Sequence, residues 1–153
     1  MRFGRPSVAN LTPADGAGVT IGKAALLTEG SDVTIIATGH LVWEAIQATE
    51  VLEAQGISVE VINMHTIKPL DEAAILASVG KTGCVVTAEE HNRHGGLGES
   101  IAQVLTTKNP APQEFVAVND SFGESGKPAQ LMEKYGLNTE AIEAAVKKVM
   151  GRK

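Results

Sequence analysis

The feature that most constrains the fold is a short run, residues 33–37, that is almost wholly apolar and rich in β-branched side chains. Such a run is typical of a strand buried on both faces, and strands of that kind occur in parallel sheets covered by helices on two sides. A turn at Thr38-Gly39 follows, and then a stripe of residues at helical spacing that ends before Gly56. The stripe consists of Val42, Ala45, Ile46, Thr49 and Leu52. A buried strand followed directly by an amphipathic helix is the repeating unit of an α/β fold.

The same unit recurs along the rest of the chain. We expect strands at residues 21–28, 33–37, 57–64, 83–88 and 114–118, and helices at residues 42–52, 71–79, 99–105, 128–135 and 139–150. Residues 1–18 are rich in turn formers and predict an irregular lead-in, whereas residues 19–153 have the length of one domain. The prediction is a three-layer α/β/α Rossmann-like sandwich with a mostly parallel sheet of about five strands, the first of which could run antiparallel at the edge.

Composition narrows the classes of function. Hydrophobic residues make up 43% of the 153 residues and charged residues 20%, which is typical of a globular domain and not of a disordered chain. The formal net charge is -5 and no basic run is visible, so we expect no nucleic-acid partner. No apolar stretch approaches the roughly 20 residues that cross a bilayer, so we expect no membrane partner and a cytoplasmic protein.

Two single residues have plain structural explanations. Cys84 falls inside a predicted buried strand, where core packing explains a free cysteine better than nucleophilic chemistry does. Trp43 lies early in an amphipathic helix, and we expect it in the core or at an interface rather than as a stacking site. Neither residue indicates a catalytic centre.

A glycine-rich segment, residues 94–98 (HGGLG), lies between a predicted strand and a predicted helix. This is the position of a dinucleotide-binding turn, but the pattern GxGxxG fails because Ile101 stands where its third glycine should be. A helix N-terminus can still hold an anion. Tight turns between strand and helix are nevertheless common without ligands, so we favour a structural turn over a phosphate cradle.

The surrounding loop, residues 89–98, also collects groups able to do chemistry. Its carboxylates and imidazoles are Glu89, Glu90, His91 and His94. Two histidines are too few to close a zinc site without carboxylates, although imidazole suits proton transfer near neutral pH. Turn or subunit contacts explain the cluster more simply, so we predict no catalytic, cofactor-binding or metal-binding residue. We expect an assembly loop or a loop facing an active site, formed by Glu89, Glu90, His91, His94, Gly95, Gly96 and Gly98.

Three stretches resemble the C-terminal domain of transketolase, and they occur in the order of that family. Residues 85–105, VVTAEEHNRHGGLGESIAQVL, are similar to its signature region. Residues 119–137, NDSFGESGKPAQLMEKYGL, are similar to its closing segment, and residues 34–45, TIIATGHLVWEA, to its opening turn between strand and helix. The closest resemblance is to transketolases whose polypeptide is split into two subunits, with this chain as part of the C-terminal one.

The resemblance implies a thiamine-diphosphate- and magnesium-dependent enzyme that transfers a two-carbon ketol unit between sugar phosphates in the pentose phosphate pathway. In that family the cofactor and its magnesium lie between two other domains. The domain alone is therefore expected to be inactive, and to act in assembly and in shaping the outer active site.

The resemblance also implies partners and one site residue. The expected partners are the N-terminal diphosphate-binding subunit and the pyrimidine-binding domain, in a homodimer-type assembly. Residues 1–18 resemble the exit segment of the pyrimidine-binding domain, which implies that Arg5 contacts the substrate phosphate. Residues 19–153 resemble the C-terminal domain itself.

Three alternatives stay open on the sequence alone. Deoxyxylulose-phosphate synthase shares this fold, and so do the 2-oxoacid dehydrogenases, in which such a domain would dock an acyltransferase. The third alternative is a stand-alone module that binds a small ligand with the loops at the strand ends.

Overall fold

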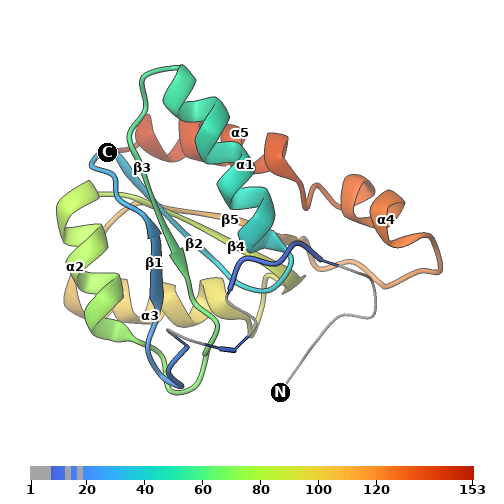
Figure 1. Ribbon diagram of the computed structural model, residues 1–153, viewed down its shortest axis with the longest axis horizontal. Helices are drawn as coiled ribbons and strands as arrows, with labels where there is room; N and C mark the ends of the chain where they lie inside the picture. The colour runs from blue at the N-terminus through green and yellow to red at the C-terminus, as the bar shows by residue number, and fades with distance from the viewer. Residues whose placement is uncertain (1–7, 13–14, 17–18) are drawn as a thin grey trace.

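The computed structural model describes residues 8–12, 15–16 and 19–153, which form a mixed five-stranded sheet with its helices (Figure 1). Its strands are β1 (Ala25–Thr28), β2 (Val33–Ala37), β3 (Val59–Asn63), β4 (Val85–Asn92) and β5 (Gln113–Val118). They follow the order β1-β3-β2-β4-β5, and every neighbouring pair is parallel except β1 and β3. The predicted sheet, mostly parallel with an antiparallel first strand at its edge, is confirmed.

Helices cover both faces of this sheet. One layer consists of α1 (Leu41–Ala54) and α5 (Thr139–Met150), and the other of α2 (Glu72–Thr82) and α3 (Leu97–Lys108). Ile35 of β2 lies in the apolar core under α1 and α5, whereas its neighbour Ile36 lies in the core under α2 and α3. Successive side chains of a strand point to opposite faces, so a strand between two cores is largely apolar on both faces. The predicted α/β/α sandwich is confirmed.

Polar side chains set the helix boundaries. Asp71 Oδ1 accepts the N–H of Ala74 (3.3 Å) at the start of α2, so Asp71 is the N-cap of this helix. α2 runs to Thr82, past the predicted end at residue 79, because the N–H of Gly83 still bonds to the carbonyl of Val79 (2.8 Å). Gly83 then ends the helix with a φ of 75°, a left-handed conformation that glycine adopts without strain.

The main correction concerns β4. We predicted a strand at residues 83–88 and a loop at residues 89–98, but β4 continues to Asn92, which still pairs with Val118 of β5. The ladder is irregular between Ala88 and Asn92, and the outer residues there are exposed or half-buried. A polar composition is compatible with a strand at such a position, and this is why the pattern of buried strands missed it.

The connection after β5 leaves the body of the domain. Residues 119–127 form an extended segment that leads to the short helix α4 (Pro128–Lys134), and α4 has no buried residue. In Figure 1 this orange segment and α4 project from the right-hand side of the sandwich. Within the part of the chain that the structure describes, no helix is both long and apolar enough to cross a membrane.

Candidate functional site

The carboxyl ends of β2 and β4 form the edge at which ligands bind in open α/β sheets. The chain passes from β2 to β3 on one side, while β4 lies on the other side, so the strand order reverses between β2 and β4. His40 follows β2, and Glu90 lies in the last part of β4. Their Nδ1 and Oε2 atoms are 3.2 Å apart across this point. The structure thus places one residue of the predicted loop, Glu90, at the switch point of the fold.

Its neighbour Glu89 points the other way, into the domain. The Glu89 side chain is only 2% exposed, and its two carboxylate oxygens accept the N–H groups of Leu97 and Gly98, both at 2.8 Å. These are unpaired donors of the first turn of α3, where the helix dipole favours a negative charge. The carboxylate therefore accepts hydrogen bonds from the first turn of α3, as a bound anion does at other helix N-termini.

The glycine turn is shaped around this carboxylate. A Cβ atom on Gly96 would lie 2.3 Å from Glu89 Oε2, and one on Gly98 would lie 2.5 Å from Cδ1 of Phe115. Both distances are far below van der Waals contact, so a side chain at either position would displace Glu89 or Phe115. This geometry agrees with the structural turn that we favoured, because the two donors that a phosphate would need are already bonded.

The two histidines of the predicted loop differ in their surroundings. His91 is half-buried, and its Nδ1 lies 2.7 Å from the carbonyl oxygen of Asn92. His94 is exposed, and its backbone N–H donates to Asn92 Oδ1 (2.9 Å). Among residues 8–12, 15–16 and 19–153 no three His, Cys, Asp or Glu side chains come together as a metal site. The turn is thus held by hydrogen bonds to Asn92, and the imidazole of His94 is exposed to solvent.

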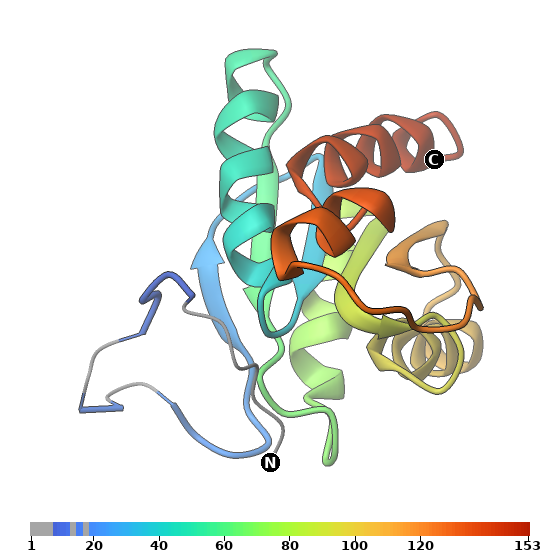
Figure 2. The ribbon, with the colours of Figure 1, turned by 90° about the vertical axis from the view of Figure 1, so that its right-hand side faces the viewer.

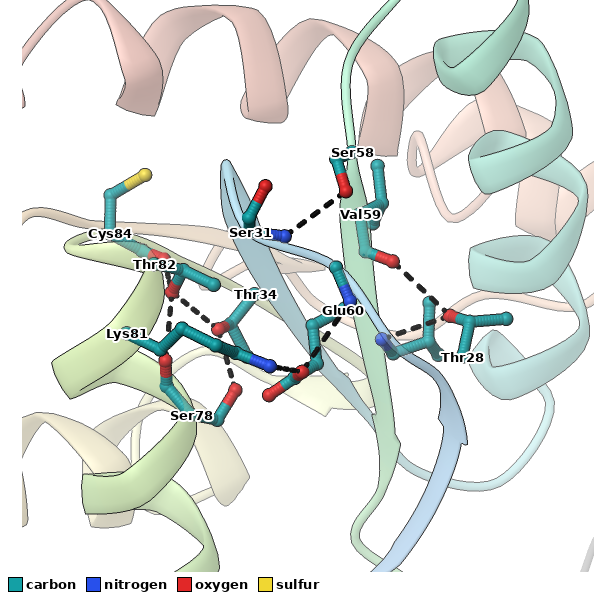
Figure 3. A network of polar contacts seen from close by, with 12 residues as sticks. Thr28, Ser31, Thr34, Ser58, Val59, Glu60, Ser78, Lys81, Thr82 and Cys84 are labelled. Carbon is teal, nitrogen blue, oxygen red and sulfur yellow. Dashed lines mark hydrogen bonds and ion pairs between the residues drawn. The ribbon is translucent and has the colours of Figure 1, made fainter.

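A network of buried polar groups links α2 to the sheet (Figure 3). Thr34 Oγ1 lies 2.7 Å from Ser78 Oγ and 2.6 Å from Thr82 Oγ1. Beside these hydroxyls, buried Glu60 forms an ion pair with Lys81. Burial raises the pKa of Glu60, but hydrogen bonds led by the one from Lys81 outweigh burial and hold that pKa below its ordinary value of 4.5. These groups satisfy one another, so the network is a structural one.

Cys84 lies beside the network at the start of β4 and is buried (Figure 3). Burial raises the pKa of its thiol, which disfavours the thiolate that nucleophilic chemistry requires. The prediction that Cys84 packs in the core is confirmed.

The sequence did not indicate a groove of about 880 Å³ between the N-terminal end of α1, α4 and the start of α5. Trp43 lines it and is 41% exposed, so this residue belongs to the surface rather than to the core. Glu44 connects two walls of the groove, α1 and α5, because its Oε2 accepts both the N–H (3.0 Å) and the hydroxyl (2.8 Å) of Thr139. In the sequence, Trp43 was the residue that could have indicated this groove. Its position in the sequence does not show that α4 and α5 lie beside it.

Arg5 lies outside the described residues, as do most of the other residues of the predicted exit segment, 1–18. The assignment of Arg5 to a substrate phosphate therefore stays a prediction.

Comparison with known proteins identifies the family. The sequence model described as "Transketolase, C-terminal domain" matches residues 22–142. The chain therefore belongs to the transketolase C-terminal domain family. This membership agrees with the resemblance of the three stretches named above.

Individual relatives are split or complete enzymes of related kinds. The 6-deoxy-6-sulfo-D-fructose transketolase subunit SqwH of Clostridium sp. (strain MSTE9) is 52% identical over 88% of this chain and 42% of its own length. An apulose-4-phosphate transketolase subunit of Phocaeicola vulgatus is 37% identical over 93% of this chain and 45% of its own. A solved chain described as "Split gene transketolase, inactive beta4 tetramer" is 43% identical, with a TM-score of 0.91 over 96% of this chain and 48% of its own. The chain thus spans less than half the length of these relatives.

The glycine-rich N-terminus of α3 does not fit a diphosphate and its magnesium ion. The N-terminus of α3, the glycine-rich place where a diphosphate could bind, is filled by the Glu89 carboxylate. A second anion there would face that negative charge. In the part of the chain that the structure describes, the N–H groups of Leu97 and Gly98 are therefore not free to bind a diphosphate.

Proposed function

We propose that this chain is the C-terminal domain of a thiamine-diphosphate-dependent transketolase, which transfers a two-carbon ketol unit between sugar phosphates. The observation that carries the proposal is the likeness to a split transketolase chain, 43% identical with a TM-score of 0.91. Thiamine diphosphate and magnesium would be held by the rest of the enzyme, in keeping with the filled helix N-terminus of α3. The domain acts in assembly and in shaping the outer part of the active site.

The partners in this proposal are the N-terminal diphosphate-binding subunit and the pyrimidine-binding domain, with residues 1–18 as the exit segment of the latter. The relatives named above, which are transketolase subunits, support a two-subunit enzyme. His91 and His94, on the tethered turn at the carboxyl end of β4, would contact the missing domain or the other subunit. Without its partners the chain would associate with itself, as does the relative described as an inactive tetramer.

A reconstitution assay tests the function. The purified chain, supplied with thiamine diphosphate, magnesium and sugar phosphates, is expected to show no ketol transfer. The complete C-terminal subunit mixed with the diphosphate-binding subunit is expected to restore it. Ketol transfer by the chain alone would falsify the accessory role, and a failed reconstitution would count against transketolase function itself.

A stand-alone ligand-binding module behaves differently. A ligand at 100 times its Kd stabilises a folded protein by about 2.7 kcal/mol. A thermal-shift screen of the isolated chain with sugar phosphates should therefore show no comparable stabilisation if the domain needs its partners.

A second candidate has specific support. The 1-deoxy-D-xylulose-5-phosphate synthase of Syntrophotalea carbinolica is 38% identical over 85% of this chain, although that covers only 21% of the synthase. Running the reconstituted enzyme with a panel of donors and analysing for 1-deoxy-D-xylulose 5-phosphate separates the two activities. Formation of that product as the main one would favour the synthase.

Arg5 provides a residue-level prediction for the complete enzyme. Guanidinium groups bind phosphate through paired hydrogen bonds, and such charge-assisted contacts contribute about 1.5–3 kcal/mol. Arg5→Ala is expected to raise the KM for sugar phosphates about tenfold or more, measured by steady-state kinetics. Arg2→Ala is the matched control. An unchanged KM in the Arg5 variant would leave it an ordinary surface charge.

A further inference from the structure

The segment after β5 displays an aromatic side chain to solvent. We call residues 119–127 the arm. All residues from Asn119 through Lys127 are exposed, and Phe122 in its middle is 99% exposed. Figure 2 shows the arm running across the face of the molecule from the end of β5 to α4. A large apolar side chain held entirely in water is typical of a surface that contacts another molecule.

Hydrogen bonds hold the arm in place at its start and near its middle. At its start, Asn119 and Asp120 accept hydrogen bonds from Arg93 (3.2 Å) and Asn92 (3.3 Å). Near its middle, the Tyr135 hydroxyl donates to Glu124 Oε1 (2.9 Å) and lies 3.3 Å from the carbonyl of Phe122.

The backbone at the start of the arm is also unusual. Asp120 has a φ of 43°, the one left-handed residue other than glycine among those described. Such backbone strain persists only where the surrounding contacts enforce it, and it concentrates at functional positions. The exposure of Phe122 is thus a feature of a tethered segment.

A groove with partly apolar walls lies beside the arm. Its volume is about 880 Å³, and its walls include the apolar side chains of Val8, Trp43, Pro128, Met132 and Leu137. The groove and the arm are continuous, because Lys127 ends the arm and also lines the groove. An exposed aromatic side chain thus lies on the segment that leads directly to a partly apolar hollow.

We propose that this face is the contact by which two copies of the chain associate, with Phe122 of each copy inserted into the groove of the other. A two-fold contact requires one patch that is complementary to itself, and a projection beside a hollow meets that requirement. A partner of another sequence would need only one of the two features. The inference rests on the self-association proposed above, and it names the surface.

Sedimentation velocity of the chain over a dilution series tests the contact. Phe122→Ser removes the projection, and Ala129→Arg places a long charged side chain in the groove wall. Each variant is expected to weaken self-association at least tenfold. Ile21→Ser is the matched control, because Ile21 is exposed and apolar but does not line the groove, and it should associate like the parent.

Mixing the two variants gives the sharper result. In a mixed pair the intact Phe122 of one copy meets the intact groove of the other, so one of the two contacts is restored. The mixture is therefore expected to associate more tightly than either variant alone. Such complementation would not arise if the substitutions merely disturbed folding.

Several results would overturn the proposal. A parent chain that stays monomeric at every concentration would do so, as would unchanged association of Phe122→Ser or a mixture no tighter than its components. If Phe122→Ser self-associates normally but binds the diphosphate-binding subunit less tightly, the groove belongs to that subunit. Reconstitution of ketol transfer with the complete C-terminal subunit is a separate readout, so failure of the proposed function would be recognised independently.

Discussion

The turn after β4 and the arm after β5 follow neighbouring parallel strands, and both are polar segments that contain glycine. In the turn, Gly96, Leu97 and Gly98 are all buried around the Glu89 carboxylate. In the arm, every residue is exposed and Phe122 lies in solvent. The two segments have a similar composition and equivalent places in the sheet. The turn is nevertheless packed into the domain, whereas the arm faces solvent.

The difference lies in where the charges are compensated. The buried Glu89 carboxylate has lost its contacts with water, and two hydrogen bonds from a helix N-terminus replace them. A rearrangement of the turn that breaks these bonds would leave a buried charge unpaired. Glu124 in the arm also has partners, Lys134 and Tyr135, but all three are near water. The turn should therefore govern the stability of the domain, and the arm should govern what the domain contacts.

The largest expected effect is at the turn. Glu89→Ala leaves the N–H groups of Leu97 and Gly98 without their acceptor and opens a cavity, and it should lower the free energy of unfolding by about 3 kcal/mol. Urea denaturation of the isolated chain measures this. Glu90→Ala is the control, since the Glu90 side chain is about half exposed and should change stability by less than about 1 kcal/mol. Equal midpoints for Glu89→Ala and the parent would break the comparison.

The dependence of stability on pH should also distinguish a buried carboxylate, that of Glu60, from an exposed one, that of Glu124. Burial raises the pKa of Glu60, but hydrogen bonds led by the one from Lys81 together outweigh burial and lower that pKa. Hydrogen bonds from Lys134 and Tyr135 lower the pKa of Glu124. A carboxylate with a lowered folded-state pKa stabilises the protein above its ordinary pKa of 4.5 and loses that contribution as pH falls through the folded-state value.

Unfolding free energies measured from pH 6 down to pH 3 check this behaviour. Glu60→Gln is expected to flatten the loss of stability below about pH 4.5, whereas Glu124→Gln should leave the profile close to that of the parent, because solvent screens its exposed pair. Equal flattening by both substitutions would mean that burial does not separate the two carboxylates.

Substitution of His91 and His94 tests whether the solvent-facing side of the turn takes part in assembly. Removing one partner of an interfacial hydrogen bond costs roughly 1–3 kcal/mol, so His91→Ala and His94→Ala are expected to weaken assembly of the complete enzyme. The melting temperature of the isolated domain should barely change, most clearly for exposed His94. Sedimentation of the enzyme on dilution, beside thermal melts of the domain, gives both readouts. Melting many degrees lower would place the histidines within the internal structure instead.

The smallest expected effect is at the arm. Phe122→Ser should change the free energy of unfolding of the monomer by less than about 0.5 kcal/mol, because a side chain that is 99% exposed buries no area on folding. The measurement is denaturation at concentrations below self-association. A loss comparable to that of Glu89→Ala would show that the arm is part of the core after all.

Much of this could be predicted from the pattern of residues. The limits of β2 and α5 match the predicted ranges, and the layered, mostly parallel sheet follows from the alternation of strands and helices. Residues 85–105 and 119–137 carried the family resemblance that the match over residues 22–142 bears out. What the pattern missed is the last part of β4, which is polar because it lies where the sheet reaches solvent.

The sequence by itself determined the local choices: which runs are strands, which stripes are helices, and that residues 94–98 form a tight turn rather than a dinucleotide site. These follow from periodicity and backbone preferences, which act over a few residues. Only the tertiary structure decided that Glu89 turns inward while Glu90 faces His40, and that Trp43 borders a groove beneath the arm. Those outcomes depend on which distant segments meet, and a pattern along the chain does not carry that information.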